Sequence, residues 1–189
     1  MQLVDAVKWI WILVGIFWAL AAFRQKRTVR RQSVTSRMLQ VGIVLLASLP
    51  FTVFEARFDP LFDKHFLSPS SSMHIVGLFL TIAGCSFGVW ARIILGRNWS
   101  GTVTVKEDHV LTTRGPYAWV RHPIYSGLLL ALLGTALVVG KMIYLLAIPV
   151  CVLALALKLR SEEKFMHETF TEQYRSYRQR VKALIPYVL

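Results

Sequence analysis

Five apolar runs constrain this chain more than any other feature of its sequence. They cover about residues 4–23, 38–54, 74–95, 124–139 and 142–159. The first and third are long enough for a helix to cross the roughly 30 Å hydrocarbon core of a bilayer. The last two are separated only by Gly140 and Lys141, and a single helix through both would overshoot the bilayer at about 1.5 Å per residue. We therefore predict an all-α integral membrane protein with about five transmembrane helices, in which spans four and five form a helical hairpin.

The positively charged residues predict the orientation of these spans. Of the 22 lysines and arginines, 18 lie in residues 24–37, 92–121 and 158–182, and the other four are Lys8, Arg57, Lys64 and Lys141. Loops rich in Lys and Arg stay in the cytoplasm, so we predict the N-terminus outside and the C-terminus in the cytoplasm. The formal net charge is +12, but the charges flank apolar runs. That distribution predicts contacts with membrane lipids and argues against a nucleic-acid partner.

Two regions follow from this organisation. Residues 1–72 hold two spans and an outer loop, and residues 73–189 hold three spans, a cytoplasmic loop and a polar tail.

Cys85 and Cys151 both lie inside apolar runs, which is typical of buried thiols and not of a disulfide. No histidine has a second ligand at metal spacing, so we predict no metal site.

The tail carries an amphipathic pattern. Its apolar residues recur at steps of three or four, which is the spacing of one helix face: Met166, Phe170, Tyr174, Tyr177, Val181 and Leu184. Pro186 would stop such a helix. We predict a C-terminal cytoplasmic helix that either lies on the membrane surface or covers a cytoplasmic site, and the periodicity leaves both alternatives open.

The stretch that precedes span four has the character of a binding site. Residues 114–127 read RGPYAWVRHPIYSG. Pro123 is placed where a helix begins, because proline is favoured at the first helical position. His122 then falls at the N-cap, where free N–H groups attract an anion, and the Arg121 fork suits a carboxylate. Three aromatic residues would form walls around it: Tyr117, Trp119 and Tyr125. For Trp119 alone we favour the role of an interfacial anchor.

A pair of carboxylates, Glu162 and Glu163, directly follows span five in a region that is otherwise positive. The end of span five and the start of span four lie at the open end of the hairpin, so the two features are expected to meet. A ligand with a carboxylate, cationic groups and a flat ring would match them, as S-adenosylmethionine does. A phosphate-bearing lipid would suit the arginines equally well.

The block at residues 109–127, followed by Glu162 and Glu163, resembles the isoprenylcysteine carboxyl methyltransferase family and its wider relatives, the phospholipid methyltransferases. The resemblance covers roughly residues 75–185. It implies S-adenosylmethionine as cofactor, and it implies that residues 73–189 form the methyltransferase core. It also implies a cofactor pocket lined by His109, Val110, Leu111, Thr112, Tyr117, His122, Pro123, Ile124, Tyr125 and one glutamate of the pair, for which we take Glu162.

In that family a basic residue about one helical turn before this glutamate meets the substrate carboxylate. Lys158 lies one turn before Glu162 and Arg160 lies two residues before it. We favour Arg160, because its fork matches a carboxylate. The expected catalytic residues are therefore Arg160, Arg121 and Glu163.

The expected function is methylation of the carboxylate of a lipophilic, isoprenylcysteine-like substrate that enters from the bilayer of a prokaryotic inner membrane. One alternative is N- or S-methylation of a lipid amine or a small thiol. Two further alternatives are a nicotinamide-dependent membrane reductase and a non-catalytic membrane protein.

Overall fold

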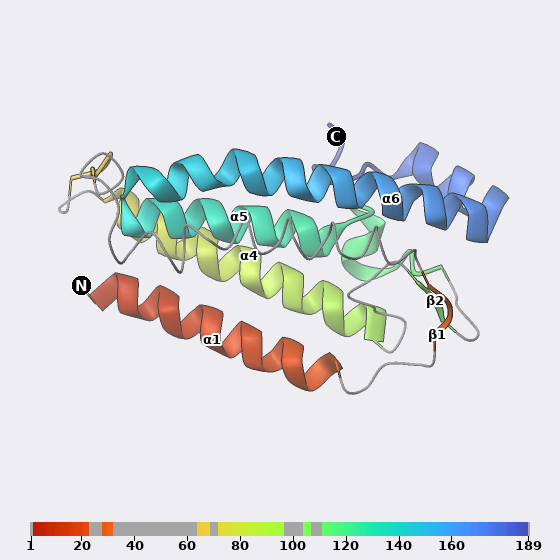
Figure 1. Cartoon of the computed structure of the whole chain (residues 1–189), viewed down its shortest axis with the longest axis horizontal. Coiled ribbons are helices and arrows are strands. Elements are labelled where there is room, and N and C mark those ends of the chain that lie inside the picture. Colours follow the sequence, from red (N-terminus) through yellow and green to blue (C-terminus); the bar gives the residue numbers. More distant parts are fainter. Residues whose placement is uncertain are drawn as a thin grey trace.

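The computed structural model of the chain describes residues 2–22, 28–31, 64–68, 72–96, 104–106 and 111–188. Four long helices dominate these residues: α1 (Gln2–Ala22), α4 (Met73–Leu95), α5 (Pro123–Val139) and α6 (Met142–Arg180). They lie side by side with their axes roughly along the longest axis of the molecule (Figure 1). The predicted second span, residues 38–54, lies outside the described residues.

The described helices confirm the predominantly helical membrane architecture. Helices α1, α4 and α6 are long and apolar enough to cross a membrane, and α5 is a shorter apolar helix of 17 residues. Their starts agree with the predicted runs to within about two residues. The count of five spans stays a prediction.

The prediction of an all-α chain is wrong in one place among the described residues, where two short strands pair. Strand β1 (Thr28–Arg31) pairs with β2 (Thr104–Lys106) in antiparallel order. The two strands have four and three residues, too few to show an alternating apolar pattern in a sequence.

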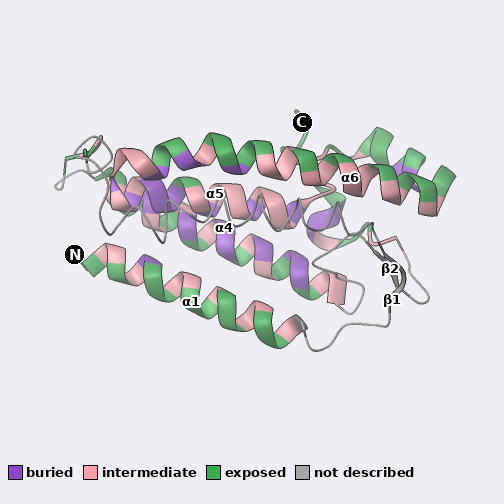
Figure 2. Cartoon of the chain, viewed as in Figure 1, coloured by how far each residue is buried: buried purple, intermediate pink, exposed green. Residues whose placement is uncertain are grey.

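Small residues bring α4 and α5 into close contact. A Cβ added at Gly84 would lie 2.5 Å from the backbone oxygen of Gly127 and 2.5 Å from the backbone nitrogen of Ala131. The same approach recurs two turns away, where a Cβ at Gly134 would lie 2.5 Å from the carbonyl oxygen of Gly77. In a membrane, where apolar burial does not drive helices together, such backbone proximity is a main source of association. Figure 2 shows the buried residues concentrated on α4 and α5, with α1 largely exposed or intermediate.

Helix α1 is attached to this pair at its middle and at its C-terminal end. Trp11 donates its indole N–H to Thr135 Oγ1 of α5 at 3.0 Å. Arg92 of α4, only 3% exposed, donates to the carbonyl oxygens of Ala21 and Gly96, each at 2.7 Å. These carbonyls belong to the ends of α1 and α4, where the helix dipole is negative, so the buried guanidinium is stabilised there.

The hairpin between α5 and α6 turns where the sequence predicts. Gly140 ends α5 in the left-handed conformation, with φ of 71°, and its N–H bonds to the Ala136 carbonyl at 2.8 Å. Glycine adopts this conformation without steric cost. His74 of α4 caps the same end, because its Nδ1 lies 2.9 Å from the Leu137 oxygen.

Helix α6 runs beyond its predicted apolar span, residues 142–159, and then turns back. Thr171 interrupts it with φ of 35° and ψ of −103°, and the last turns fold back toward the start of α5 (Figure 1). We call residues 172–184 the C-terminal segment. Its helix was expected to reach the region of Pro186 but ends at Arg180, because Val181 is extended and the following residues pair with the start of α5.

Replacing Gly84 with Ala is expected to destabilise the fold, because the new Cβ meets backbone atoms that have no room to move. We expect a loss of about 1–3 kcal/mol, as for other overpacked cores, measured by thermal unfolding in detergent. Gly15→Ala on α1 is the matched control, since a Cβ there meets no described atom within 4 Å. Equal stability of the two variants would contradict the close packing of α4 on α5.

Candidate active site

The candidate active site lies where the start of α5 meets α6 beyond its apolar part. His122 is the N-cap of α5 and Pro123 is its first residue, as the sequence predicts. The His122 ring reaches Glu163 on α6, with Nε2 2.8 Å from Oε1. The predicted meeting of the helix start with the glutamate pair is therefore confirmed.

The backbone before α5 is held by the C-terminal segment. The N–H of Arg121 donates to the Lys182 carbonyl at 2.8 Å, and the N–H of His122 donates to the Ala183 carbonyl at 2.9 Å. One turn into α5, Ser126 Oγ donates to the Leu184 carbonyl at 2.6 Å. The bond from the His122 N–H satisfies a donor that a helix start otherwise leaves without a partner, and the other two fasten the segment on either side of it.

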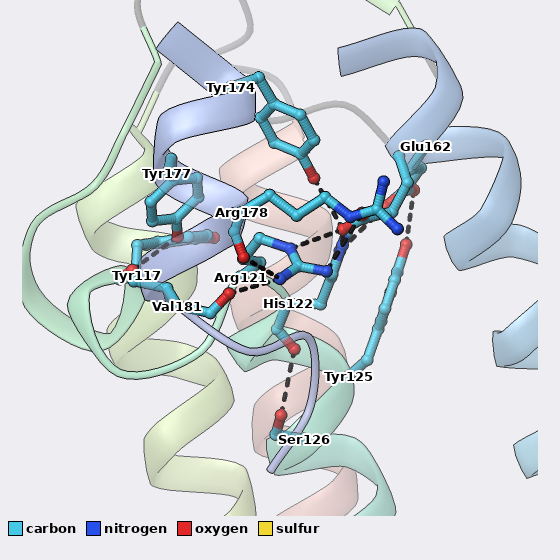
Figure 3. A network of polar contacts seen from close by, with 11 residues as sticks. Tyr117, Arg121, His122, Tyr125, Ser126, Glu162, Tyr174, Tyr177, Arg178 and Val181 are labelled. Atoms are coloured by element: carbon cyan, nitrogen blue, oxygen red, sulfur yellow. Dashed lines mark hydrogen bonds and ion pairs between the residues drawn. The ribbon is translucent and has the colours of Figure 1, made fainter. Parts of the chain in front are cut away.

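Glu163 is the centre of the polar contacts. Arg121 binds it with two parallel bonds, Nε to Oε1 at 2.8 Å and Nη2 to Oε2 at 3.1 Å. Tyr174 donates its hydroxyl to Oε1 at 2.7 Å, and Arg178 Nε lies 3.5 Å from Oε2. Figure 3 shows these side chains converging from three parts of the chain. We call Glu163 with Arg121, His122, Tyr174 and Arg178 the Glu163 cluster.

Glu162 has a more open environment than its neighbour. It accepts one short hydrogen bond, from the Tyr125 hydroxyl at 2.5 Å. His122 Nδ1 lies 3.6 Å from its Oε2, and Lys158 Nζ lies 4.0 Å from its Oε1. The Glu162 side chain is 21% exposed against 12% for Glu163, so Glu162 retains capacity to bind a ligand.

The charges of the site are fixed by these contacts. Burial raises the pKa of Glu163, but hydrogen bonds from His122, Arg121 and Tyr174 outweigh burial and lower it to about 2. Burial lowers the pKa of His122, but its bonds to Glu162 and Glu163 outweigh burial, and that pKa is raised. Both glutamates are therefore ionised near neutral pH, and the imidazolium form of His122 is favoured.

A comparison with known families assigns the chain. The sequence profile described as phospholipid methyltransferase matches residues 72–173, which is more than half of the chain. The chain belongs to the phospholipid methyltransferase family. The matched residues include α4, α5 and both glutamates of the site.

Several named proteins are similar to the chain. A protein-S-isoprenylcysteine O-methyltransferase of Tribolium castaneum is 31% identical over 179 residues, covering 91% of this chain and 60% of the relative. The protein-S-isoprenylcysteine O-methyltransferase B of Arabidopsis thaliana is 34% identical over 115 residues, covering 59% of this chain and 58% of the relative. The predicted resemblance to isoprenylcysteine carboxyl methyltransferases is confirmed. The chain spans about three fifths of the length of these two relatives.

A solved structure shares the fold. It is described as the eukaryotic intramembrane Ras methyltransferase, isoprenylcysteine carboxyl methyltransferase, and it matches with a TM-score of 0.57 at 25% identity. The match covers 85% of this chain and 55% of the solved chain.

The structure gathers most of the predicted site residues that it describes. Tyr117, His122, Pro123, Ile124, Tyr125, Glu162, Glu163 and Arg121 all lie at this junction. Leu111 and Thr112 are half-buried in the preceding loop, whereas His109 and Val110 lie outside the described residues. Arg160 is exposed and does not contribute to the Glu163 cluster. Lys158 lies beside Glu162, with its ammonium 5.5 Å from the centre of the Tyr125 ring.

The contribution of the C-terminal tyrosines was only partly anticipated. Tyr174 and Tyr177 were placed on the apolar face of the predicted tail helix, and they are 2% and 4% exposed. The Tyr177 hydroxyl donates to the Tyr117 carbonyl at 2.6 Å. Of the two alternatives for the tail, the burial of these two tyrosines favours the one in which the tail covers the site. Their hydroxyl partners had no signal in the sequence, because the fold-back at Thr171 brings them together.

Glu163 is expected to make stability depend on pH in the acid range. A carboxylate whose pKa is lowered on folding stabilises the fold above its ordinary value of 4.5, and this contribution is lost as pH falls toward about 2. The full contribution is on the order of 3 kcal/mol. The difference in thermal stability between the wild type and Glu163→Gln should therefore be largest above pH 5 and shrink toward pH 3. A difference that does not change with pH would contradict the ionised cluster.

Proposed function

We propose that the chain is an S-adenosylmethionine-dependent membrane methyltransferase that methylates the carboxylate of a lipophilic, isoprenylcysteine-like acceptor. The observation that carries this proposal is the packing of Glu162 and Glu163 against the start of α5, at the end of the apolar part of α6. Membership of the phospholipid methyltransferase family and the names of the similar proteins support it.

The residues of the site fit the methyl donor. S-adenosylmethionine carries an electrophilic methyl group on a sulfonium, together with an ammonium, a carboxylate and a flat adenine. Glu162 is the carboxylate with unused acceptor capacity, so we assign it to the cationic part of the donor. The aromatic ring of Tyr125 lies next to it, with its hydroxyl bonded to Glu162. The pocket predicted from residues 109–125 remains part of this proposal.

For the acceptor carboxylate we propose Lys158 in place of Arg160. Lys158 lies one helical turn before Glu162, with its ammonium 4.0 Å from that carboxylate, whereas Arg160 is exposed away from the cluster. A lysine holds a carboxylate as a point charge and without a fork. Holding the acceptor close to the methyl group is the main task, since an in-line displacement depends on alignment.

The charge states of the site favour a carboxylate acceptor over an amine or a thiol. An ammonium or a thiol must lose a proton before it attacks, whereas a carboxylate is already ionised. The contacts around Glu162 and Glu163 lower the pKa of both despite their burial, and the pKa of His122 is raised. Carboxylates with lowered pKa values are weaker bases, and the contacts with both glutamates shift His122 toward its protonated form, in which it cannot accept a proton.

We also propose that the site faces the cytoplasm, with the N-terminus outside, in a prokaryotic inner membrane. The distribution of lysines and arginines supports the orientation. The hairpin places Lys141 at the opposite end of α5 from the site. The prokaryotic membrane is carried over from the sequence analysis, and the relatives described above are eukaryotic.

The direct test is a transfer assay with labelled S-adenosylmethionine and a panel of acceptors. We expect methylation of an S-prenylated cysteine with a free carboxylate, and no methylation of aminophospholipids or small thiols. Methylation of an amine or a thiol would support the alternative acceptors. Binding of a reduced nicotinamide dinucleotide with no binding of S-adenosylmethionine would overturn the proposal.

Lys158→Met is expected to lower kcat/KM for the carboxylate acceptor by roughly 10- to 100-fold, the effect of losing a charged hydrogen bond. Arg160→Met is the matched control, because it removes a charge of the same sign two residues away on the exposed side of α6. Equilibrium binding of the methyl donor should change less than turnover in both variants. A large loss in Arg160→Met with an active Lys158→Met would return the role to Arg160.

Turnover is expected to rise with the length of the prenyl or acyl chain of the acceptor. Helix α6 exposes large apolar side chains, such as Leu153 and Leu157, up to the level of Lys158, which suits an acceptor that arrives from the bilayer. Each buried CH₂ would contribute about 0.8 kcal/mol. The measurement compares kcat/KM for a series of acceptors that differ only in chain length. Equal values for a short, water-soluble acceptor and its long-chain analogue would contradict entry from the membrane.

A further inference from the structure

The carboxylate of Glu163 is surrounded by contacts within the protein. An ionised carboxylate offers about four lone-pair sites, two on each oxygen. Oε1 accepts three hydrogen bonds, from Arg121 Nε, His122 Nε2 and the Tyr174 hydroxyl, and Oε2 accepts one from Arg121 Nη2 and faces Arg178 Nε at 3.5 Å. A ligand ammonium would have to displace one of these hydrogen bonds or the Arg178 ion pair.

Arg121 is equally committed within the protein. Its Nε and Nη2 bind Glu163, and its Nη1 donates to the backbone carbonyl oxygens of Val181 and, at 3.4 Å, Arg178. Both edges of the guanidinium are therefore used by the protein itself. The fork that the sequence suggests for a ligand carboxylate holds α6 and the C-terminal segment.

The five residues of the Glu163 cluster come from three segments that are distant in sequence. Arg121 and His122 precede α5, Glu163 lies on α6, and Tyr174 and Arg178 belong to the C-terminal segment (Figure 3). The backbone bonds from residues 121 and 122 to residues 182 and 183 fix the same segment. The Glu163 carboxylate is the one group of the cluster that the other four side chains all contact.

His122 connects this cluster to the ligand-binding part of the site. Its ring is stacked on Tyr125, with an angle of 1° between planes and 5.7 Å between centres. Its Nε2 is held by Glu163 at 2.8 Å, so its Nδ1 faces Glu162 at 3.6 Å. The bond to Glu163 thus sets the orientation of the ring beside the more open carboxylate.

We propose that Glu163 and Arg121 act as a pair of positioning residues: together they hold the C-terminal segment and His122 against the start of α5, and neither touches the methyl donor or the acceptor. This inference rests on the proposed methyltransferase function for its effect on turnover. It assigns different roles to the two adjacent glutamates, with Glu162 facing the ligand and Glu163 facing the protein.

The attachment of the C-terminal segment is measured by limited trypsin digestion of the full chain in detergent. The segment offers exposed cleavage sites at Arg175, Arg178, Arg180 and Lys182. Glu163→Gln should speed cleavage within it by about tenfold or more, because cleavage follows the population of the opened state. Glu162→Gln, the adjacent carboxylate, is the matched control and should leave the cleavage rate near that of the wild type.

Binding and turnover separate positioning from ligand contact. Glu163→Gln should keep the Kd of S-adenosylmethionine within about threefold, whereas Glu162→Gln should raise it about tenfold or more. The kcat of Glu163→Gln should fall by roughly 10- to 100-fold, because small misplacements are costly in an alignment-dependent reaction. Arg121→Met should behave in the same way, and the double variant should be no worse than the poorer single variant.

Tyr174→Phe keeps the test decisive if the stronger variants do not fold, because it removes a single hydroxyl from the cluster. It should raise the rate of trypsin cleavage and lower kcat, each by a smaller factor, with the donor Kd unchanged.

The inference is overturned if Glu163→Gln raises the donor Kd as much as Glu162→Gln while the segment stays resistant to trypsin. It is also overturned if the effects of Arg121→Met and Glu163→Gln on kcat are additive. A wild type that binds no S-adenosylmethionine, yet shows the expected trypsin pattern, would refute the proposed function and leave the attachment intact.

Discussion

A carboxylate placed at the end of a membrane helix must be neutralised, and the way Glu163 is neutralised organises this site. Its partners, Arg121 and His122, precede α5, and Tyr174 returns from the far end of α6. Removing any one of them would leave a poorly solvated charge, which costs more than the pair itself contributes. The requirement therefore ties together the start of α5, the polar extension of α6 and the C-terminal segment.

The rest of the fold supplies a fixed position for this junction. Helices α4 and α5 approach so closely at Gly84 and Gly127 that a Cβ on either would overlap backbone atoms of the other helix. Close backbone packing of this kind holds helices together in lipid without an apolar driving force. Helix α5 is thus packed on α4 along its length, and α6 is joined to it by a tight turn at Gly140, at the end opposite the site. At the site itself, the Glu163 cluster connects α6 to the residues that precede α5.

The sequence predicted the elements better than their connections. Apolar runs located α1, α4 and α5 to within about two residues, because a membrane helix is specified by its composition over its whole length. The turn at Gly140 and the helix start at Pro123 were also predictable, since glycine and proline act there through their own backbone geometry. The short strands and the fold-back at Thr171 were not, because neither depends on a pattern long enough to detect.

The sequence predicted which residues meet at the site but not which partner each of them binds. The helix start and the glutamate pair were recognised from residue types, and the hairpin brought them together. Arg121 was expected to bind a ligand carboxylate, but in the fold its nearest carboxylate is Glu163 of the same chain. Lys158 is beside Glu162 because residues four apart share a helix face, whereas Arg160, two residues away, points elsewhere. The sequence-based choice of Arg160 gave its fork more weight than this spacing. The rotation of α6 about its axis directs one glutamate toward the protein and leaves the other partly exposed.

The most direct test of this account is hydrogen–deuterium exchange of the full chain with and without saturating S-adenosylmethionine. If the donor binds between the start of α5 and the polar part of α6, protection should increase in residues 111–126 and 158–184. Residues 64–68, which contact the turn at Gly140 at the opposite end of α5, should exchange equally in both states. Bound donor with protection confined to other parts of the chain would contradict the central claim that this junction is the methyl-transfer site.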